Sequence, residues 1–468
     1  MVAGLLCGLA AVPGRKMDDK SVPGYPAGPD VVIDFARSAG KFKPLNGVNG
    51  GPFHYASQQI PIEGYHARAG FTSTRLHDAN WPHPDAVDIN TIFPLFNADA
   101  DDPANYAFAK TDDYLLPIVR NGSAIIYRLG VSIEHKTRYF IDPPRNYEKW
   151  AKICVNIIRH YNEGWANGHH YNIKYWEIWN EPEGKAMWLG TTAQYLQLYG
   201  VTARAIKAHD PSLKVGGPAS TGALSPLMKP FLAYCHDNSL PLDFCSWHLY
   251  SYRVADYVRN TGIVRNMLDE YGFTNTQSFL DEWHFIPAWS ALSPKDSLDT
   301  SVEKSFAATI AGEGAAFSAA VLMQLQDHPV DVMNFYCADY SPWSMFDVFG
   351  VPGKVYFAFL AYHQLTQLPE RIICTKAAAD STLTVAASRS ANRNEAAVLI
   401  SNVGKTARSF SAALRNIYGS GKIKLEMYTV DETHQLSLTD HRELSDPSLL
   451  TLNLAPESVS LVKLVRSK

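Results

Sequence analysis

Two glutamates stand where the chain could hold a pair of catalytic carboxylates. Glu181 lies in the Trp-Asn-Glu-Pro motif at 179–182 and Glu282 in the Leu-Asp-Glu-Trp motif at 280–283, and each motif follows a short apolar run typical of a buried β-strand. A carboxylate at the C-terminal end of such a strand lies at the face of a parallel barrel where substrates bind. Two carboxylates converging over one barrel mouth are what hydrolysis of a glycosidic bond requires, so the pair favours a glycoside hydrolase.

A third carboxylate, Glu177, precedes the first motif. Side chains alternate along a strand, so Glu177, Trp179 and Glu181 are expected on one face, with only Glu181 at the open end. A deeper Glu177 would be a buried charge that needs a partner, which Arg75 or Arg128 on neighbouring strands could supply. Glu177 is therefore predicted to be structural and Glu181 catalytic.

Asp281 competes with Glu282 for the second catalytic position. Adjacent strand residues point to opposite faces, so only one of the two is expected to face the barrel axis. Glu282 is favoured because its side chain has the longer reach and Trp283 follows it. A single glutamate at a strand end more often forms a surface salt bridge, but two of them, with Arg75 and His248 at other strand ends, favour chemistry.

The elements that must position these residues alternate between short apolar runs and amphipathic helical stretches. This alternation, from about residue 43 to residue 363, is typical of βα units around a parallel sheet. Eight candidate strands predict a closed (β/α)8 TIM barrel. Their ends are marked by Asn46, Arg75, Arg128, Glu181, Gly217, His248, Glu282 and the run at 334–336. Between them, helices are predicted from apolar residues at three- and four-residue steps, as at Trp150, Ile153, Ile157 and Tyr161.

After about residue 365 the apolar pattern changes to strict alternation. Ile423, Leu425 and Met427 are expected on one face of a half-buried antiparallel strand. A C-terminal β-sandwich domain follows. We expect an N-terminal lead-in at 1–30, a catalytic barrel at 31–365 whose first strand, 31–35, could join the sandwich, and a stabilising accessory domain at 366–468.

Composition excludes several classes of function. A formal net charge of −4 over 468 residues, without a long basic block, does not predict a basic surface that would bind nucleic acid or an anionic membrane. The six cysteines show no C-x-x-C spacing, and the acidic run at 99–102 lacks the glycine and the distal glutamate of a calcium-binding loop. Neither a metal nor another cofactor is therefore predicted. The apolar stretch at 2–12 is too short to span a membrane; if it is a signal-peptide remnant the protein is secreted or periplasmic, and otherwise cytoplasmic.

The ordered set of motifs resembles glycoside hydrolase family 39 of clan A, known for β-xylosidases and α-L-iduronidases. The resemblance runs over most of the chain, through the motifs at 46–50, 75–77, 176–182, 215–218, 248–250 and 281–283. One departure is Asp281, where many relatives carry threonine. The resemblance implies roles for seven residues: Glu181 as general acid/base, Glu282 as nucleophile, Asn180 on the sugar 2-hydroxyl, Arg75 and Tyr250 on the nucleophile, and His77 and His248 lining the −1 subsite.

Other site residues are predicted from their position alone. His77 and His248 could equally be hydrogen-bonded core histidines. Trp283, directly after the nucleophile, and Trp343, near the last strand, are the expected stacking platforms for sugar rings. The long segment 78–113 would close off subsites and favour action on chain ends.

The prediction is thus a retaining exo-glycosidase acting on plant or microbial oligosaccharides or polysaccharides, most similar to a β-xylosidase. Arabinosidase, galactosidase, iduronidase and endo-glycanase specificities are alternatives within the enzymes. A catalytically silent carbohydrate-binding barrel is the alternative from another class.

Overall fold

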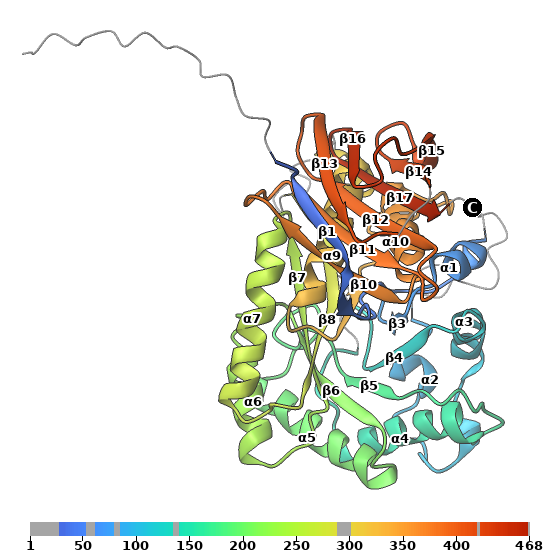
Figure 1. The fold of residues 1–468 in the computed structure, drawn as a ribbon. Coiled ribbons are helices and arrows are strands. Elements are labelled where there is room, and N and C mark those ends of the chain that lie inside the picture. Colours follow the sequence, from blue (N-terminus) through green and yellow to red (C-terminus); the bar gives the residue numbers. More distant parts are fainter. Residues whose placement is uncertain are drawn as a thin grey trace, which may run out of the picture.

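The computed structural model describes residues 28–52, 61–78, 85–133, 140–287, 301–418 and 422–466. Its larger part is a closed barrel of eight parallel strands (Figure 1). The strands are β2 (Gly47–Asn49), β3 (Ser73–Leu76), β4 (Ala124–Leu129), β5 (Tyr175–Ile178), β6 (Lys214–Ser220), β7 (Phe244–Ser251), β8 (Gln277–Phe285) and β9 (Val332–Phe335). Each predicted strand end lies in, or within a few residues of, one of these strands, and the predicted barrel is confirmed.

Helices cover the outside of the barrel, and an amphipathic helix does so because its apolar stripe must be buried. The helices of the described residues are α1 (Glu63–Ala69), α2 (Ile89–Ile92), α3 (Ala109–Arg120), α4 (Tyr147–Glu163), α5 (Thr192–His209), α6 (Met228–Asp237), α7 (Val254–Glu270), α8 (Ser301–Ile310), α9 (Gly312–Gln324) and α10 (Lys354–Thr366). In α4 the predicted stripe of Trp150, Ile153, Ile157 and Tyr161 is buried. The N-cap of this helix is Asn146, whose side chain accepts from the backbone N–H of Lys149 at 2.8 Å.

The barrel interior is divided into an apolar base and a polar upper layer. Ile126, Phe244 and Phe279 form a small cluster separate from the core between strands and helices. Tyr175 on β5 packs against this cluster, and Phe279 on β8 belongs to it. Glu177 and Asp281 lie two residues further along these strands, so both point into the barrel above the apolar base. The polar side chains of the site are therefore held on a closed, rigid sheet.

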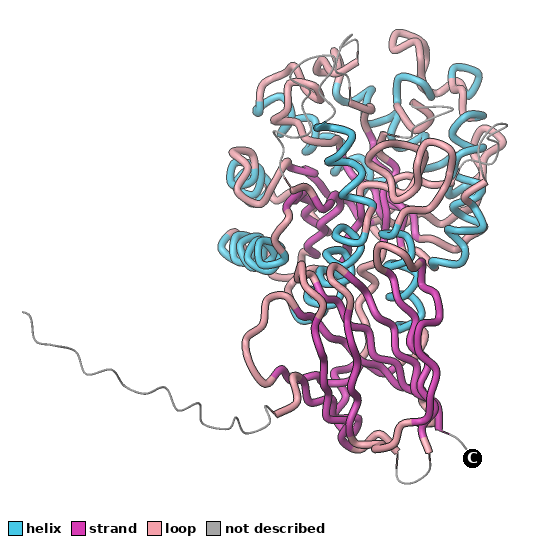
Figure 2. The backbone as a smooth tube through the Cα atoms, turned by 90° about the horizontal axis from the view of Figure 1, so that it is seen from above, coloured by secondary structure: helices cyan, strands magenta, loops and turns pink. Residues whose placement is uncertain are grey.

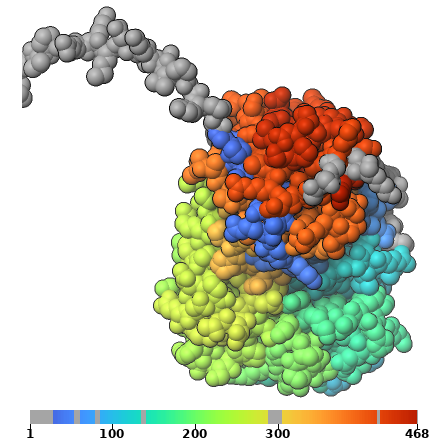
Figure 3. Space-filling model, in the orientation of Figure 1, coloured from blue at the N-terminus to red at the C-terminus, as the bar shows by residue number. Residues whose placement is uncertain are grey.

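The smaller part is one mixed sheet of nine strands, ordered β15-β14-β17-β12-β11-β10-β1-β13-β16. Its strands are β1 (Val31–Gly40), β10 (Glu370–Lys376), β11 (Leu383–Arg389), β12 (Glu395–Asn402), β13 (Arg408–Arg415), β14 (Ile423–Val430), β15 (Gln435–Glu443), β16 (Leu449–Leu454) and β17 (Ser458–Arg466). The N-terminal β1 lies between β10 and β13, so the two ends of the described chain share this sheet (Figures 1 and 3).

The central strands β12 and β17 of this sheet are buried on both faces. Leu399 and Leu461 belong to the core shared with the barrel, whereas Val398 and Ile400, which point the other way, belong to a core of the sheet's own. Ser401 donates to the carbonyl of Ala316 in α9 at 2.6 Å, which ties the sheet to the barrel's helices. Figure 2 shows the strands gathered on one side of the barrel. The predicted alternation of Ile423, Leu425 and Met427 is confirmed, because all three are buried and the residues between them are not.

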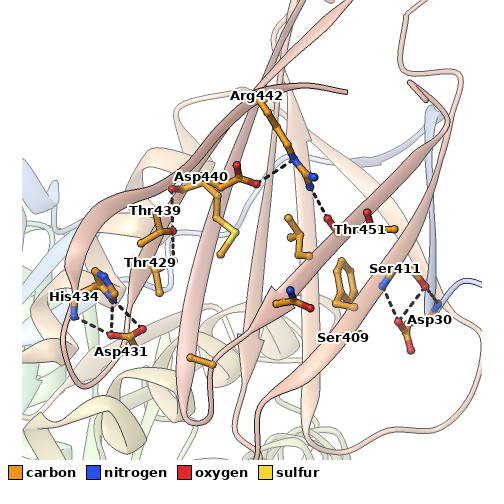
Figure 4. A pocket seen from close by; sticks show the side chains of 15 residues that line it. Asp30, Ser409, Ser411, Thr429, Asp431, His434, Thr439, Asp440, Arg442 and Thr451 are labelled. Carbon is orange, nitrogen blue, oxygen red and sulfur yellow. Dashed lines mark hydrogen bonds and ion pairs between the residues drawn. The ribbon is translucent and has the colours of Figure 1, made fainter. Parts of the chain in front are cut away.

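The sheet curls until its two edge strands meet, which gives it a sandwich-like form. Arg442 of β15 donates to the carbonyl of Thr451 in β16 at 2.6 Å. A pocket of about 680 Å³ lies between these edges, and Figure 4 shows that its polar side chains pair with one another, as in Asp431 with His434 and Asp30 with Ser411. In the described part of the chain, no helix has both the length and the apolar character needed to cross a membrane.

Candidate active site

Glu181 reaches the barrel mouth through a turn rather than along the strand. β5 ends at Ile178, and Trp179 and Glu181 both have left-handed backbones, with φ of 74° and 41°. The predicted shared face of Glu177, Trp179 and Glu181 is therefore wrong for the tryptophan. Trp179 packs against Trp150 and Trp188 in the helical layer, and its indole N–H donates to the carbonyl of Met187 at 2.9 Å.

The carboxyl group of Glu181 is largely buried from solvent. Its backbone N–H donates to the carbonyl of Ala219 at 2.9 Å, and its Oε1 lies 2.8 Å from Nδ1 of His248. Burial, followed by the negative charge of Glu183, raises the pKa of Glu181 to about 7. A carboxyl group with that pKa can give and take a proton near neutral pH.

A β-bulge in β8 places two adjacent carboxyl groups in the barrel interior. In the pairing with β7, Trp247 lies opposite Leu280 and His248 opposite Glu282, so Asp281 is the extra residue. The prediction that only one of Asp281 and Glu282 can face the axis is therefore wrong. Both contact Arg75, Asp281 at 3.1 Å and Glu282 at 2.8 Å.

Glu282 is held by donors on both of its oxygens. Arg75 Nη1 donates to Oε1 at 2.8 Å, and the hydroxyl of Tyr250 donates to Oε2 at 2.7 Å. Nδ1 of His248 lies 3.3 Å from the same Oε2. One oxygen of Glu282 and one of Glu181 lie within 4.8 Å of each other, so the structure brings the two predicted catalytic carboxyls together.

Arg75 is the centre of the polar layer. Its Nε donates to Glu177 at 2.7 Å, which confirms the predicted ion pair of that buried glutamate. Its Nη2 donates to Oδ1 of Asn180 at 2.6 Å, which leaves the amide nitrogen of Asn180 as the group available to a substrate. Arg128 instead pairs with Asp88 at 2.7 Å.

Both predicted site histidines are buried next to the carboxyl pair. In His77, Nδ1 accepts from Nε of Arg128 at 3.1 Å, so Nε2 carries the ring hydrogen and faces Asp78 at 3.2 Å. Nε2 of His77 also lies 3.9 Å from Glu282. Burial lowers the pKa of His248 to about 4, so this imidazole is neutral near neutral pH. Both rings are thus core residues that also border the site.

The two predicted stacking platforms have different surroundings. Trp283 is fully buried among Phe335, Phe359 and Tyr257, so a sugar cannot reach it and its prediction as a platform is wrong. The reason is again the bulge, which turns Glu282 inward and the next residue outward. Trp343 is partly exposed, with its ring 6.2 Å from that of Tyr250.

Tyr336 is a site neighbour that the sequence pattern did not identify. Its hydroxyl donates to Asp78 at 3.2 Å, and its ring lies 6.5 Å from Tyr250 and 6.3 Å from Trp343. The available signal was its position directly after β9, where other strands of the barrel also place site residues. Residues 79–84, part of the segment expected to close off subsites, lie outside the described residues.

Two groups of histidines and carboxyls in the described ranges are compact enough to hold a metal ion. One is Glu181, His248 and Glu282, and the other is Asp112, His160 and His169 on the helical layer. In the second group His160 has both ring nitrogens at oxygens, the Trp165 carbonyl at 2.9 Å and Asp112 at 3.1 Å. Hydrogen bonds therefore account for both contacts of this histidine without an ion.

Two carboxyl groups this close together, at the mouth of a (β/α)8 barrel, form the arrangement that the class of glycoside hydrolases requires. Within the class, the model of glycosyl hydrolases family 39 matches residues 83–384, more than half of the chain, and the protein belongs to this family.

Individual relatives are more distant. A β-xylosidase from Geobacillus stearothermophilus is 28% identical over 237 residues, which are 48% of this chain and 45% of the relative, so the match spans less than half of that protein. The structure of a glucosidase from Croceicoccus marinus is 26% identical, with a TM-score of 0.79 over 94% of this chain and 99% of the other. A β-xylosidase from Caulobacter crescentus CB15 shares the fold at 18% identity, with a TM-score of 0.71 over 94% and 99% of the two chains.

Proposed function

We propose that this family 39 enzyme is a retaining exo-glycosidase with β-xylosidase-like specificity, in which Glu181 is the general acid/base and Glu282 the nucleophile. The observation that carries the proposal is the pairing of a carboxyl whose pKa is raised to about 7 with a second carboxyl held by Arg75 and Tyr250. Carboxyl separations of about 5–5.5 Å go with retention and about 6.5–9.5 Å with inversion. An oxygen-to-oxygen approach within 4.8 Å supports the first class.

In the first step Glu282 attacks the anomeric carbon while Glu181 gives its proton to the departing glycosidic oxygen. The bond to the leaving group breaks as the ester to Glu282 forms, and Glu181 is left as a carboxylate. The contact between Arg75 and Glu282 stabilises the negative charge before attack and fixes the oxygen that points to the sugar.

In the second step Glu181 acts as a base. It removes a proton from water as that water attacks the anomeric carbon, and Glu282 leaves as a carboxylate. Loss of the negative charge of Glu282 in the ester lowers the pKa of Glu181, because a neighbouring like charge has gone. The same side chain can therefore serve as acid and then as base.

The substrate class is proposed from the groups around the carboxyl pair. The free amide nitrogen of Asn180 is placed to donate to the sugar 2-hydroxyl, since its oxygen is occupied by Arg75. Trp343 supplies a partly exposed aromatic face next to Tyr250. β-Xylosidases among the relatives favour a xyloside, whereas the likeness to the Croceicoccus glucosidase makes a glucoside the second candidate.

The test is hydrolysis of a panel of nitrophenyl glycosides, with the β-xyloside and β-glucoside compared directly. We expect the β-xyloside to have the highest kcat/KM, and proton NMR of the first product to show the β-anomer. A first product with inverted configuration would remove Glu282 from the nucleophile's role.

A second experiment locates the nucleophile. A 2-fluoro glycoside of the preferred sugar, with a good leaving group, should accumulate as an ester on Glu282, and peptide mapping should find it there. Glu282→Ala should abolish the label, and Asp281→Asn should retain it. Label on Asp281 would contradict the assignment.

A further inference from the structure

Glu183 carries a carboxyl group that takes no step in the proposed mechanism. It stands two residues after Glu181 in the loop that follows β5, and its side chain reaches the loop that follows β6. There Oε1 accepts from the backbone N–H of Thr221 at 2.8 Å, the hydroxyl of Thr221 at 2.9 Å and the hydroxyl of Ser225 at 2.6 Å. Hydrogen bonds to a carboxylate are among the stronger ones, so this oxygen joins the two loops firmly.

The residues that hold Glu183 are themselves fixed to rigid elements. Thr221 directly follows Ser220, the last residue of β6. The hydroxyl of Ser225 accepts from the backbone N–H of Leu227 at 3.1 Å, and Leu227 is the N-cap of α6. Glu183 is therefore attached to the end of a barrel strand and to the start of a helix.

The turn to which Glu183 belongs has an unfavourable backbone. Glu181 has a φ of 41°, and its N–H donates at 2.9 Å to the carbonyl of Ala219, whose φ is 51°. Left-handed values are disfavoured for residues with a Cβ atom and persist only where the surroundings hold them. The N–H of Gly184 donates to the carbonyl of Glu181 at 2.8 Å, which closes residues 181–184 into one turn. A force on Glu183 therefore acts on Glu181.

This turn is held from two sides. On the side of the barrel axis, Oδ1 of Asn180 accepts from Arg75 at 2.6 Å, and Oε1 of Glu181 lies 2.8 Å from Nδ1 of His248. On the side of β6, the hydrogen bonds of the described residues are the one from Glu181 to Ala219 and the three that Glu183 accepts. Without Glu183, a single backbone hydrogen bond would remain on that side.

We propose that Glu183 is a positioning residue for the reaction. By joining the turn at 181–184 to Thr221 and Ser225, it holds the carboxyl group of Glu181 where that group can give its proton to the leaving oxygen. The role rests on the proposed function, in which Glu181 is the acid/base. The negative charge of Glu183 is a separate effect, because it adds to burial in raising the pKa of Glu181.

Three variants separate the hydrogen bonds from the charge. Glu183→Ala removes both, whereas Glu183→Gln removes the charge and keeps an oxygen that can accept from the same donors. No donor faces Oε2, so the amide nitrogen of the glutamine variant meets no opposing donor. Ser225→Ala removes one donor and keeps the charge. Lys185→Ala, at an exposed position of the same loop, is the matched control.

The readout is the dependence of kcat/KM on the leaving group, taken at the maximum of each variant's pH profile so that the change in pKa does not enter. A misplaced acid matters only where the leaving group needs a proton. Glu183→Ala should therefore lose about tenfold or more on a glycoside with a poor leaving group, and nearly nothing on the dinitrophenyl glycoside. Glu183→Gln should keep most of the wild-type rate on both, and Lys185→Ala should match wild type.

Ser225→Ala should show the same selective loss in weaker form, and combining it with Glu183→Ala should add nothing, because the link is already broken. The positioning role is refuted if Glu183→Ala loses nothing on the poor leaving group, if it loses equally on both substrates, or if Glu183→Gln is as impaired as Glu183→Ala. If Glu183→Ala does not fold, Ser225→Ala decides by the presence or absence of the selective loss.

Glu181→Gln distinguishes a failure of this inference from a failure of the proposed function. If Glu181→Gln shows a strong dependence on the leaving group and Glu183→Ala shows none, only the positioning role is wrong. If Glu181→Gln shows no such dependence, Glu181 is not the acid and the proposed function fails with it.

Discussion

Replacing the proposed acid should change the pH dependence of hydrolysis in a way that follows from its surroundings. The pKa of Glu181 is raised from 4.5 to about 7. At pH 6 a group of pKa about 7 is about 90% protonated, whereas an ordinary glutamate is about 3% protonated, a difference of about thirtyfold in active enzyme. Because Glu181 must be protonated for the first step, its contribution to kcat/KM should be full below the shifted pKa, and kcat/KM should fall as pH rises through about 7.

The assay is kcat/KM on an aryl glycoside with a poor leaving group, measured from acid to alkaline pH. In Glu181→Gln the fall of kcat/KM at alkaline pH should vanish, and kcat/KM should be about 10²–10⁴-fold lower than in wild type. Added azide should restore turnover of activated substrates. Glu183→Gln is the matched control, because it removes the negative charge that adds to the effect of burial on the pKa of Glu181 but keeps the acid itself. In this variant kcat/KM should still fall at alkaline pH, with its midpoint at a lower pH than in wild type. The assignment would be refuted if kcat/KM of Glu181→Gln still fell at alkaline pH as in wild type, or if the wild-type fall had its midpoint near pH 4.5.

Three further predictions concern groups around the pair. Glu177→Gln removes one of the carboxylate partners of the buried Arg75, which keeps Glu282, so urea unfolding should show a loss of about 1–3 kcal/mol in the free energy of unfolding, while the dependence of rate on leaving group stays as in wild type. Tyr250→Phe removes the donor to Oε2 of Glu282 and should lower kcat about tenfold or more at unchanged thermal stability; an unaltered kcat would show that this hydrogen bond is not used. Trp343→Ala should raise KM without lowering Tm, because this ring is proposed to contact the sugar. Trp283→Ala should lower the free energy of unfolding by about 3–5 kcal/mol, because it leaves a cavity in the core. The opposite pattern would make Trp283 the sugar contact and Trp343 the core residue.

Much of the barrel could be predicted from the sequence because its signals are local. Each strand is a short apolar run, and α4 shows its buried stripe directly in the spacing from Trp150 to Tyr161. The ion pair of Glu177 with an arginine was predictable for the same reason, since a charge within an apolar run needs a partner on a neighbouring strand.

The errors share one cause, which is backbone irregularity at the ends of strands. Strict alternation assigned Trp179 to the face of Glu181, but left-handed residues at both positions turn the indole into the helical layer. Alternation also separated Asp281 from Glu282, but the bulge opposite His248 turns both inward and moves Trp283 into the core. A bulge is fixed by the register with the neighbouring strand, so no local pattern reveals it.

The sequence by itself determined the number of barrel strands, the apolar faces of the helices and the two glutamates at strand ends, because these depend on residue type and spacing along one segment. Only the tertiary structure decided that Arg75 contacts three carboxyls, that His248 lies between Glu181 and Glu282, and that Asp281 lies beneath them without an ordinary donor. Those properties arise from charges on four different strands meeting in one dry layer. The energy of each charge there depends on all the others, so it is a property of the assembled barrel.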